Sequence, residues 1–201
     1  METRTSHLWA ATGLLAALAV LAGCSAGTMS SAATGGATSP PATSGATSQP
    51  GPTTPSWFAT PMFDVNTGKA FRVSDFAGKV VLVEMMATWC PSCEAEMSQI
   101  QLLHAEYGPN SDLVTISLDV DPNEDSALLK KFATQKGFSW IIAVAPPSVR
   151  TFLAKNYDAD LLNPPLQPML IIDREGGVWG LPFHLKSAIS LKKTIDPYLA
   201  Q

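Results

Sequence analysis

Hydrophobic residues divide the 201-residue chain into three parts. Residues 8–23 are mostly Leu, Ala and Val, and residues 25–56 contain almost no large apolar side chains. Residues 57–201 alternate between short apolar runs and mixed polar segments. Because only this last part has enough apolar side chains for a core, we predict one folded domain there.

The short apolar runs of the domain, bounded by Gly, Asp and Asn, predict its strands. The run at 80–86 (VVLVEMM) is nearly continuous, which is typical of a strand buried on both faces of a partly parallel sheet. The expected strands are 62–65, 70–73, 80–86, 113–118, 139–144, 169–173 and 177–181. The first two and the last two are expected to form hairpins around turns that contain glycine.

The mixed segments between these runs predict helices at 91–107, 121–136, 147–156 and 187–199, with a short helical turn at 74–76. In the first helix, Pro91 suits the first turn, Glu94 and Glu96 suit its positive end, and Gly108 ends it. Strands that alternate with helices predict an α/β domain.

The first part of the chain resembles a bacterial lipoprotein signal. Arg4 precedes an apolar run that is too short for a membrane-spanning helix, and Leu21-Ala22-Gly23-Cys24 is similar to a lipobox. The resemblance implies cleavage before Cys24 and a lipid on its sulfur, which would anchor the protein outside the cytoplasm, on the cell membrane or a Gram-negative outer membrane. The alternative is an ordinary secretory signal followed by a free cysteine.

Residues 25–56 contain no Lys, Arg, Asp or Glu and consist almost entirely of Ser, Thr, Ala, Gly and Pro. Such a segment cannot bury enough apolar surface to offset its chain entropy, so we expect a disordered tether. The predicted organisation is a signal peptide at 1–23, a lipidated cysteine and tether at 24–56, and a folded domain at 57–201.

Composition and charge exclude several classes of function. The formal net charge is −4, whereas nucleic-acid binders usually carry a basic face, so we expect no nucleic-acid partner. Three cysteines are too few for a disulfide-stapled scaffold or an all-cysteine zinc site. Asp119, Asp121, Glu124 and Asp125 lack EF-hand spacing, so we expect a solvated acidic face where a helix starts. We predict no metal and no cofactor, and a monomer by default.

The candidate active site is Trp89-Cys90-Pro91-Ser92-Cys93, at the junction of a predicted strand and helix. Two cysteines separated by two residues can close a small disulfide loop. Unpaired amides and the helix dipole favour a thiolate at Cys90, which can attack a disulfide of a partner. Cys93, one turn further, is placed to resolve the mixed disulfide. The cysteine count therefore indicates catalysis rather than scaffolding.

Residues 80–93 (VVLVEMMATWCPSC) resemble the active-site strand and helix of the thioredoxin superfamily. The preceding hairpin, residues 75–79 (DFAGK) and the segment between 119 and 144 resemble its TlpA/ResA-like branch of exported, membrane-tethered thiol–disulfide oxidoreductases. The resemblance implies a thioredoxin-like fold: a central mixed sheet flanked by helices, an N-terminal hairpin and an inserted strand–helix unit. It also implies protein thiols and disulfides as substrates and a membrane partner that transfers electrons.

Two glutamates match positions that matter in this superfamily. Glu84 stands six residues before Cys90, where thioredoxins carry a buried acid that is thought to exchange protons with the second cysteine. Burial should raise its pKa into the range of a general base, unless its side chain reaches solvent. Glu96 stands where the ResA-like branch often carries a glutamate near the cysteines, which implies redox tuning. The alternative is that Glu96 only stabilises the first helical turn.

Pro168 matches the cis-proline of the superfamily, with Pro165 as a weaker candidate. The resemblance implies that it faces the cysteines and shapes a groove in which substrate backbone pairs as an added strand. Gln167 departs from the Thr, Val or Pro that is usual before this proline. The residues expected to tune the potential or line the groove are Gln167, Trp89, Pro91, Ser92 and Glu96.

Four functions remain open at this stage. The branch and the two glutamates favour a reductase, with substrates such as apocytochrome c or the cysteines of metal sites. An oxidase that inserts disulfides would use the same residues. A thiol peroxidase normally has Thr or Ser three residues before its cysteine, where this chain has Ala87. A copper chaperone of this fold uses cysteines separated by three residues and a histidine; here the separation is two, although His184 could serve.

Overall fold

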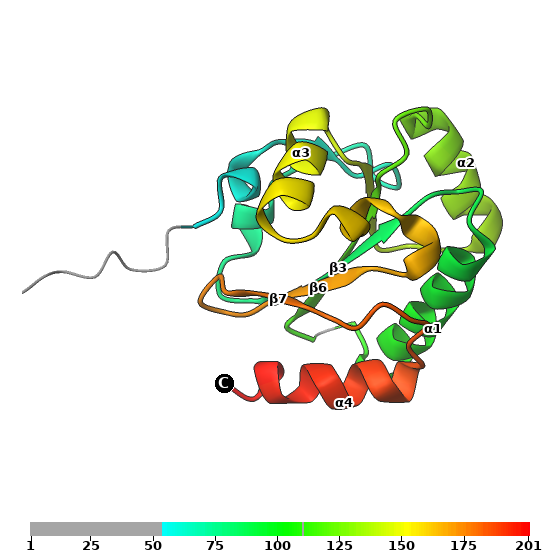
Figure 1. Cartoon of the computed structure of the whole chain (residues 1–201). Coiled ribbons are helices and arrows are strands. Elements are labelled where there is room, and N and C mark those ends of the chain that lie inside the picture. The colour runs from blue at the N-terminus through cyan, green and yellow to red at the C-terminus, as the bar shows by residue number, and fades with distance from the viewer. Residues whose placement is uncertain (1–53, 110) are drawn as a thin grey trace, which may run out of the picture. The chain divides into compact units, whose positions relative to one another are not determined.

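The computed structural model describes residues 54–109 and 111–201, so the predicted signal peptide, Cys24 and most of the predicted tether lie outside the described residues. A five-stranded sheet in the order β5-β4-β3-β6-β7 forms the centre of the domain (Figure 1). Strands β3 (Val80–Met86), β4 (Leu113–Asp119) and β5 (Ile141–Val144) are parallel. Strands β6 (Met169–Ile172) and β7 (Val178–Gly180) are antiparallel, which makes the sheet mixed, as expected.

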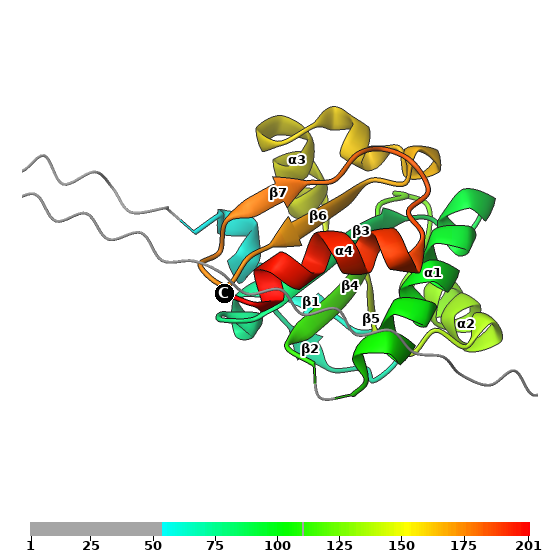
Figure 2. The same ribbon diagram turned by 90° about the horizontal axis from the view of Figure 1, so that it is seen from below.

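Helices cover both faces of this sheet (Figures 1 and 2). Helices α1 (Pro91–Tyr107), α2 (Ser126–Lys136) and α4 (Ala188–Leu199) contribute to one hydrophobic core. Helix α3 (Pro147–Asn156) contributes to a second core together with the N-terminal segment. The arrangement confirms the expected α/β fold class.

All seven residues of β3 are buried, and they serve the two cores alternately. Val80, Leu82 and Met86 lie in the core with α1, while Val81, Val83 and Met85 lie in the core with α3. Because side chains alternate across a strand, Glu84 points to the α1 side, where the cysteines are. The strand pattern therefore decides which face receives the acid.

The N-terminal hairpin, β1 (Met62–Phe63) and β2 (Ala70–Phe71), pairs as predicted. The N–H of Val65 donates to the carbonyl of Ile142 at 2.8 Å, which attaches the hairpin to β5. A 3₁₀ turn at Val73–Phe76 follows it. Three further 3₁₀ turns, Ser56–Ala59, Ala159–Leu162 and Pro164–Leu166, have no counterpart in the sequence prediction.

One helix boundary and one surface assignment were wrong. Helix α2 begins at Ser126, five residues later than expected, because the Asp125 carboxylate accepts the N–H groups of Ala127 and Leu128 and caps the helix there. Residues 121–124 form the loop that precedes it. Asp119, expected on a solvated acidic face, is completely buried because it ends the interior strand β4.

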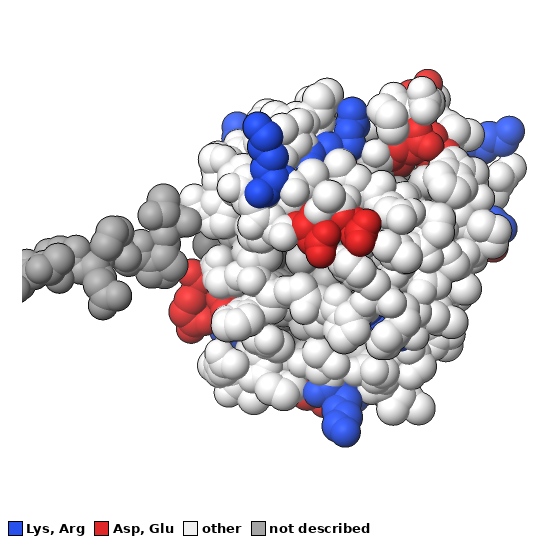
Figure 3. All heavy atoms as spheres, in the orientation of Figure 1, with Lys and Arg blue, Asp and Glu red and all other residues white. Residues whose placement is uncertain are grey.

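Charged side chains of both signs are scattered in small groups over the face seen in Figure 3, with uncharged surface between them. Within residues 54–109 and 111–201, no helix combines the length and the apolar character needed to cross a membrane. The longest of them, α1, has 17 residues; it buries Leu103 and leaves Leu102 exposed.

Candidate active site

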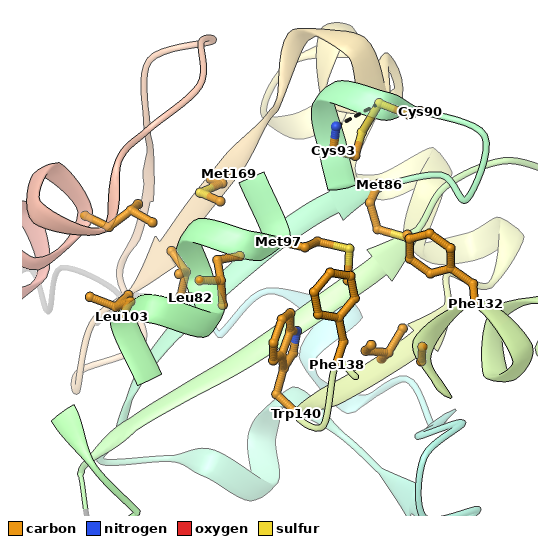
Figure 4. Packing of buried hydrophobic residues seen from close by; sticks show 14 of the residues in the cluster. Leu82, Met86, Cys90, Cys93, Met97, Leu103, Phe132, Phe138, Trp140 and Met169 are labelled. Carbon is orange, nitrogen blue, oxygen red and sulfur yellow. Dashed lines mark hydrogen bonds between the residues drawn. A yellow bond between two sulfur atoms is a disulfide. The ribbon is translucent and has the colours of Figure 1, made fainter. Parts of the chain in front are cut away.

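Cys90 and Cys93 form a disulfide at the start of α1, with their Cα atoms 5.3 Å apart (Figure 4). Cys90 is the N-cap residue and Pro91 occupies the first turn, where its missing N–H costs nothing. The N–H of Cys93 donates to Cys90 Sγ at 3.1 Å, and the Ser92 hydroxyl lies 3.3 Å from the same sulfur. These donors and the helix dipole would stabilise negative charge on Cys90 after reduction.

The 3₁₀ turn at Pro164–Leu166 lies against the disulfide. Both cysteines are only 1% exposed, and Cys93 Sγ lies 3.2 Å from the carbonyl oxygen of Pro164. The Ser92 hydroxyl donates to the carbonyl of Pro165 at 3.4 Å. The turn therefore packs against the Cys93 sulfur and the Ser92 side chain, and the disulfide is shielded from solvent.

Gln167 and Pro168 lead from that turn into β6. Because β6 runs antiparallel to β3, its first residues lie beside the end of β3, and Met85 N–H donates to the Pro168 carbonyl at 3.0 Å. Gln167 is the one described residue other than glycine with a positive φ, 56°, and its amide donates to the Ser92 carbonyl at 3.4 Å. The topology thus brings this loop to the cysteines; the cis peptide bond at Pro168 stays a prediction.

Glu84 is buried on the α1 side of β3. The Ser117 hydroxyl donates to its Oε2 at 2.7 Å and itself accepts the indole N–H of Trp140 at 2.9 Å. Its Oε1 has no hydrogen-bond partner within the described part of the chain. Burial raises the pKa of Glu84 from 4.5 to about 8, although the Ser117 hydrogen bond opposes the rise. Most of the Glu84 side chains are therefore protonated at neutral pH, and a minor fraction is ionised.

Glu96 is also fully buried, so it does more than stabilise the first turn of α1. The backbone N–H of Lys186 donates to its Oε1 at 3.1 Å, and Lys186 Nζ lies 3.6 Å from the same oxygen. Burial raises the pKa of Glu96 above its usual value, and the charge and hydrogen bonds of Lys186 offset part of that rise. The lysine therefore favours the ionised form of this carboxyl.

Lys186 was missed at the sequence level. It lies in a segment of mixed apolar and polar residues just before α4 (LPFHLKS, 181–187), and no local pattern marks it as buried. In the structure its side chain is only 4% exposed, and Nζ donates to the carbonyls of Gln167 at 2.9 Å and His184 at 2.7 Å. Burial lowers the pKa of Lys186, whereas Glu96 and Glu84 raise it.

The loop between β4 and α2 holds the two residues that precede Cys90. Glu124 accepts the N–H of Thr88 at 2.8 Å and also its hydroxyl. Asp121 accepts the indole N–H of Trp89 at 2.6 Å, and the Trp89 ring is 55% exposed. These carboxylates were expected to be solvated, and their contacts with Thr88 and Trp89 join segments that are distant in the sequence.

Burial, with the charges of Glu124 and Asp121, raises the pKa of Asp119 to about 7.

His184, considered above as a copper ligand, is exposed, and its ring lies 3.1 Å from the carbonyl of Leu185. Over residues 54–109 and 111–201, no three His, Cys, Asp or Glu side chains are grouped so that they could hold a metal ion. The site combines a disulfide with two buried acids, Glu84 and Glu96, and a buried lysine, Lys186.

Comparison with known proteins places this geometry in context. The family model described as Redoxin matches residues 49–179. Thiol-disulfide oxidoreductase ResA of Bacillus thuringiensis subsp. konkukian is 30% identical over 111 residues, which cover 55% of this chain. The match spans 58% of the length of that ResA protein. It confirms the expected similarity to the ResA-like branch.

Two solved structures share the fold. A protein described as a putative protein disulfide isomerase from Bacteroides thetaiotaomicron is 24% identical, with a TM-score of 0.57, over 71% of this chain and 86% of its own. A secreted Mycobacterium tuberculosis disulfide oxidoreductase, described as homologous to E. coli DsbE, is 15% identical with a TM-score of 0.51, over 70% and 94%. At these identities the similarity establishes a common thioredoxin-like fold.

Proposed function

Because the chain belongs to the redoxin family, we propose that it is an oxidoreductase that exchanges electrons with protein thiols and disulfides through Cys90 and Cys93. The observation that carries this proposal is the disulfide at the N-terminus of α1, with the Cys93 N–H directed at the Cys90 sulfur. The name and activity of the ResA relative support it.

In the reduced protein, the Cys90 thiolate attacks one sulfur of a partner's disulfide, and the other partner sulfur leaves as a thiolate. Cys93 then loses its proton and attacks the Cys90 sulfur of this mixed disulfide, which releases the second partner sulfur. The partner gains two electrons and takes up two protons, and this chain is left as the disulfide. We assign to the ionised form of Glu84 the acceptance of the Cys93 proton, because a pKa of about 8 is close to that of a free thiol and leaves a minor fraction of the side chain ionised at neutral pH.

We propose that the protein works as a reductase, on substrates such as apocytochrome c or the cysteines of metal sites, and that a membrane partner supplies its electrons. A strong oxidant of this kind depends on a stabilised thiolate in its reduced form. Glu96 is buried in α1, three residues after Cys93, and its negative charge when ionised opposes a thiolate, while protonated Glu84 supplies no charge that would stabilise one. This opposes the effect of the helix N-terminus and favours the disulfide, which corresponds to a low reduction potential.

We further propose that the protein is exported and held at a membrane by a lipid on Cys24. The sequence of residues 1–24 supports this, and the mycobacterial structure is described as a secreted protein. The unaltered protein expressed in a bacterial host should incorporate labelled fatty acid, and a Cys24→Ser variant should incorporate none. Equal incorporation in the two, or none in the unaltered protein, would contradict the lipid anchor.

The order of attack gives a direct test of the exchange reaction. Purified Cys93→Ser protein, reduced and mixed with a disulfide-containing protein, should accumulate a covalent mixed disulfide, because the resolving thiol is absent. The matched Cys90→Ser variant should form none and should lose reductase activity. Both are read by non-reducing electrophoresis, and a Cys90→Ser variant with full exchange activity would overturn the proposal.

A further inference from the structure

Lys186 is a buried cation that links three separate parts of the active site. Its Nζ lies 3.6 Å from Glu96 on α1 and donates to the carbonyl of Gln167 in the loop before β6. A second bond goes to the carbonyl of His184, in the segment that leads to α4. A buried charge is tolerated only when it is paired and hydrogen-bonded, so these three contacts specify where the ammonium group lies.

The charges of this region do not balance if every group is ionised. Two buried carboxyls, Glu84 and Glu96, share one buried ammonium group. Lys186 contacts Glu96 through both its backbone N–H and its Nζ. Glu84 is instead bonded to the neutral hydroxyl of Ser117. One ammonium neutralises one carboxylate, so the second carboxyl keeps a proton, and the contacts identify Glu84 as the one that does.

His184 is a further titratable side chain that acts on Glu96. It is exposed, and it lowers the pKa of Glu96 less than Lys186 does. Burial is the main reason that the pKa of Glu84 is raised, and the charge of Glu96 adds to the rise. The ionised state of Glu96 therefore also helps to keep the proton on Glu84.

We propose that Lys186 is a positioning residue of the exchange reaction: it keeps Glu96 ionised so that Glu84 alone carries the exchangeable proton, and it holds the Gln167 backbone beside the cysteines. This rests on the proposed function for its consequence in catalysis. The assignment of the proton is a property of the folded protein and is measured without any exchange reaction.

Lys186→Met keeps the length of the side chain and removes its charge. In ¹³C NMR titrations of the glutamate carboxyl groups, with Glu96 assigned by its loss in Glu96→Gln, Glu96 should be ionised near pH 7 in the unaltered protein. In Lys186→Met its affinity for a proton should rise about tenfold or more. An unchanged titration of Glu96 would overturn the proposal. Lys192→Met, which removes a surface ammonium paired with Asp196, is the control.

Glu96→Gln gives an independent test if Lys186→Met does not fold. Without the charge of Glu96, and with Lys186 released from it, the pKa of Glu84 should fall, because Glu96 raises it and Lys186 lowers it. A pH titration of the Glu84 carboxyl resonance measures this pKa directly. A Glu84 titration that is the same in Glu96→Gln as in the unaltered protein would contradict the proposed coupling between the two carboxyl groups.

The backbone contact has its own readout. Lys186→Met should raise the KM for a protein disulfide severalfold, because Gln167 lies in the loop that faces the substrate, while Lys192→Met should leave the KM unchanged. An unchanged KM in Lys186→Met would contradict this part of the proposal. If Cys90→Ser kept full activity while Lys186→Met still shifted the Glu96 titration, the proposed function would fail and the proton assignment would stand.

Discussion

Glu84 is an acidic residue whose charged form is disfavoured by the strand that contains it. Its neighbours in β3 are all apolar and buried, and the alternation of the strand gives it no route to solvent. An ionised carboxylate there loses its hydration and gains a single hydrogen bond from Ser117. The protein tolerates the residue by leaving it protonated, with a pKa of about 8.

This pKa makes stability depend on pH. Because the folded-state pKa lies above the unfolded value of 4.5, the folded protein binds this proton more tightly. The free energy of unfolding should therefore fall as pH rises from about 4.5 to about 8 and then level off. Glu84→Gln cannot ionise and lacks this loss. The difference in free energy of unfolding between Glu84→Gln and the unaltered protein should therefore increase by on the order of 4 to 5 kcal/mol, in favour of the variant, as pH rises from about 4.5 to about 8.

Urea denaturation of the oxidised protein at pH values across this window measures the difference. Glu106→Gln, which alters an exposed glutamate of α1, should keep the pH dependence of the unaltered protein. Parallel stability curves for Glu84→Gln and the unaltered protein would show that Glu84 is not held protonated by the fold.

At the scale of elements, two parallel strands present their loops at one edge of the sheet. Strand β4 ends beside β3, and Val120 N–H donates to the Met86 carbonyl at 3.0 Å, which continues the ladder past the strand ends. The loop after β4 then reaches Thr88 through Glu124. The segment before Cys90 is therefore fixed by the loop after β4 as well as by its connection to α1.

Glu124→Ala should lower the free energy of unfolding by about 1–3 kcal/mol, because it removes both acceptors of Thr88 and leaves a partly buried N–H without a partner. The backbone amides of Thr88 and Trp89 should also exchange faster with deuterium. Glu175→Ala, at the exposed turn between β6 and β7, is the control. Full stability and unchanged amide exchange in Glu124→Ala would mean that this contact does not hold the loop.

Elements with local signals could be predicted from the sequence. The continuous apolar run of β3 and the proline in the first turn of α1 gave both elements with their observed bounds. The start of α2 was misplaced because Asp121-Pro122 looks like a helix start, while the cap at Asp125 is used instead.

Contacts between distant segments could not be predicted in this way. Lys186 meets Glu96 across 90 positions and Glu124 meets Thr88 across 36, so no pattern within one window contains either pair. The cover over the cysteines also depends on a distant turn, at Pro164–Leu166. Sequence patterns therefore gave the reacting cysteines and the buried acid, whereas the groups that control them required the three-dimensional fold.

At the scale of the whole molecule, the sheet order brings the active site together. Because β3 lies between parallel β4 and antiparallel β6, one end of the sheet carries the start of α1, the loop after β4 and the loop before β6. Charges elsewhere are scattered and of both signs on the face seen in Figure 3. The buried charges beside the cysteines are therefore the ones expected to set the reduction potential.

The reduction potential of Cys90–Cys93 tests this account most directly. The purified protein is equilibrated with thiol buffers of defined potential, and the fraction of free thiols is measured. The buried acids near the disulfide, which do not stabilise a thiolate, predict a value near about −270 mV, in the range of thioredoxin. A value near about −120 mV, that of a strong oxidant, would show that the thiolate is stabilised and would contradict the reductase.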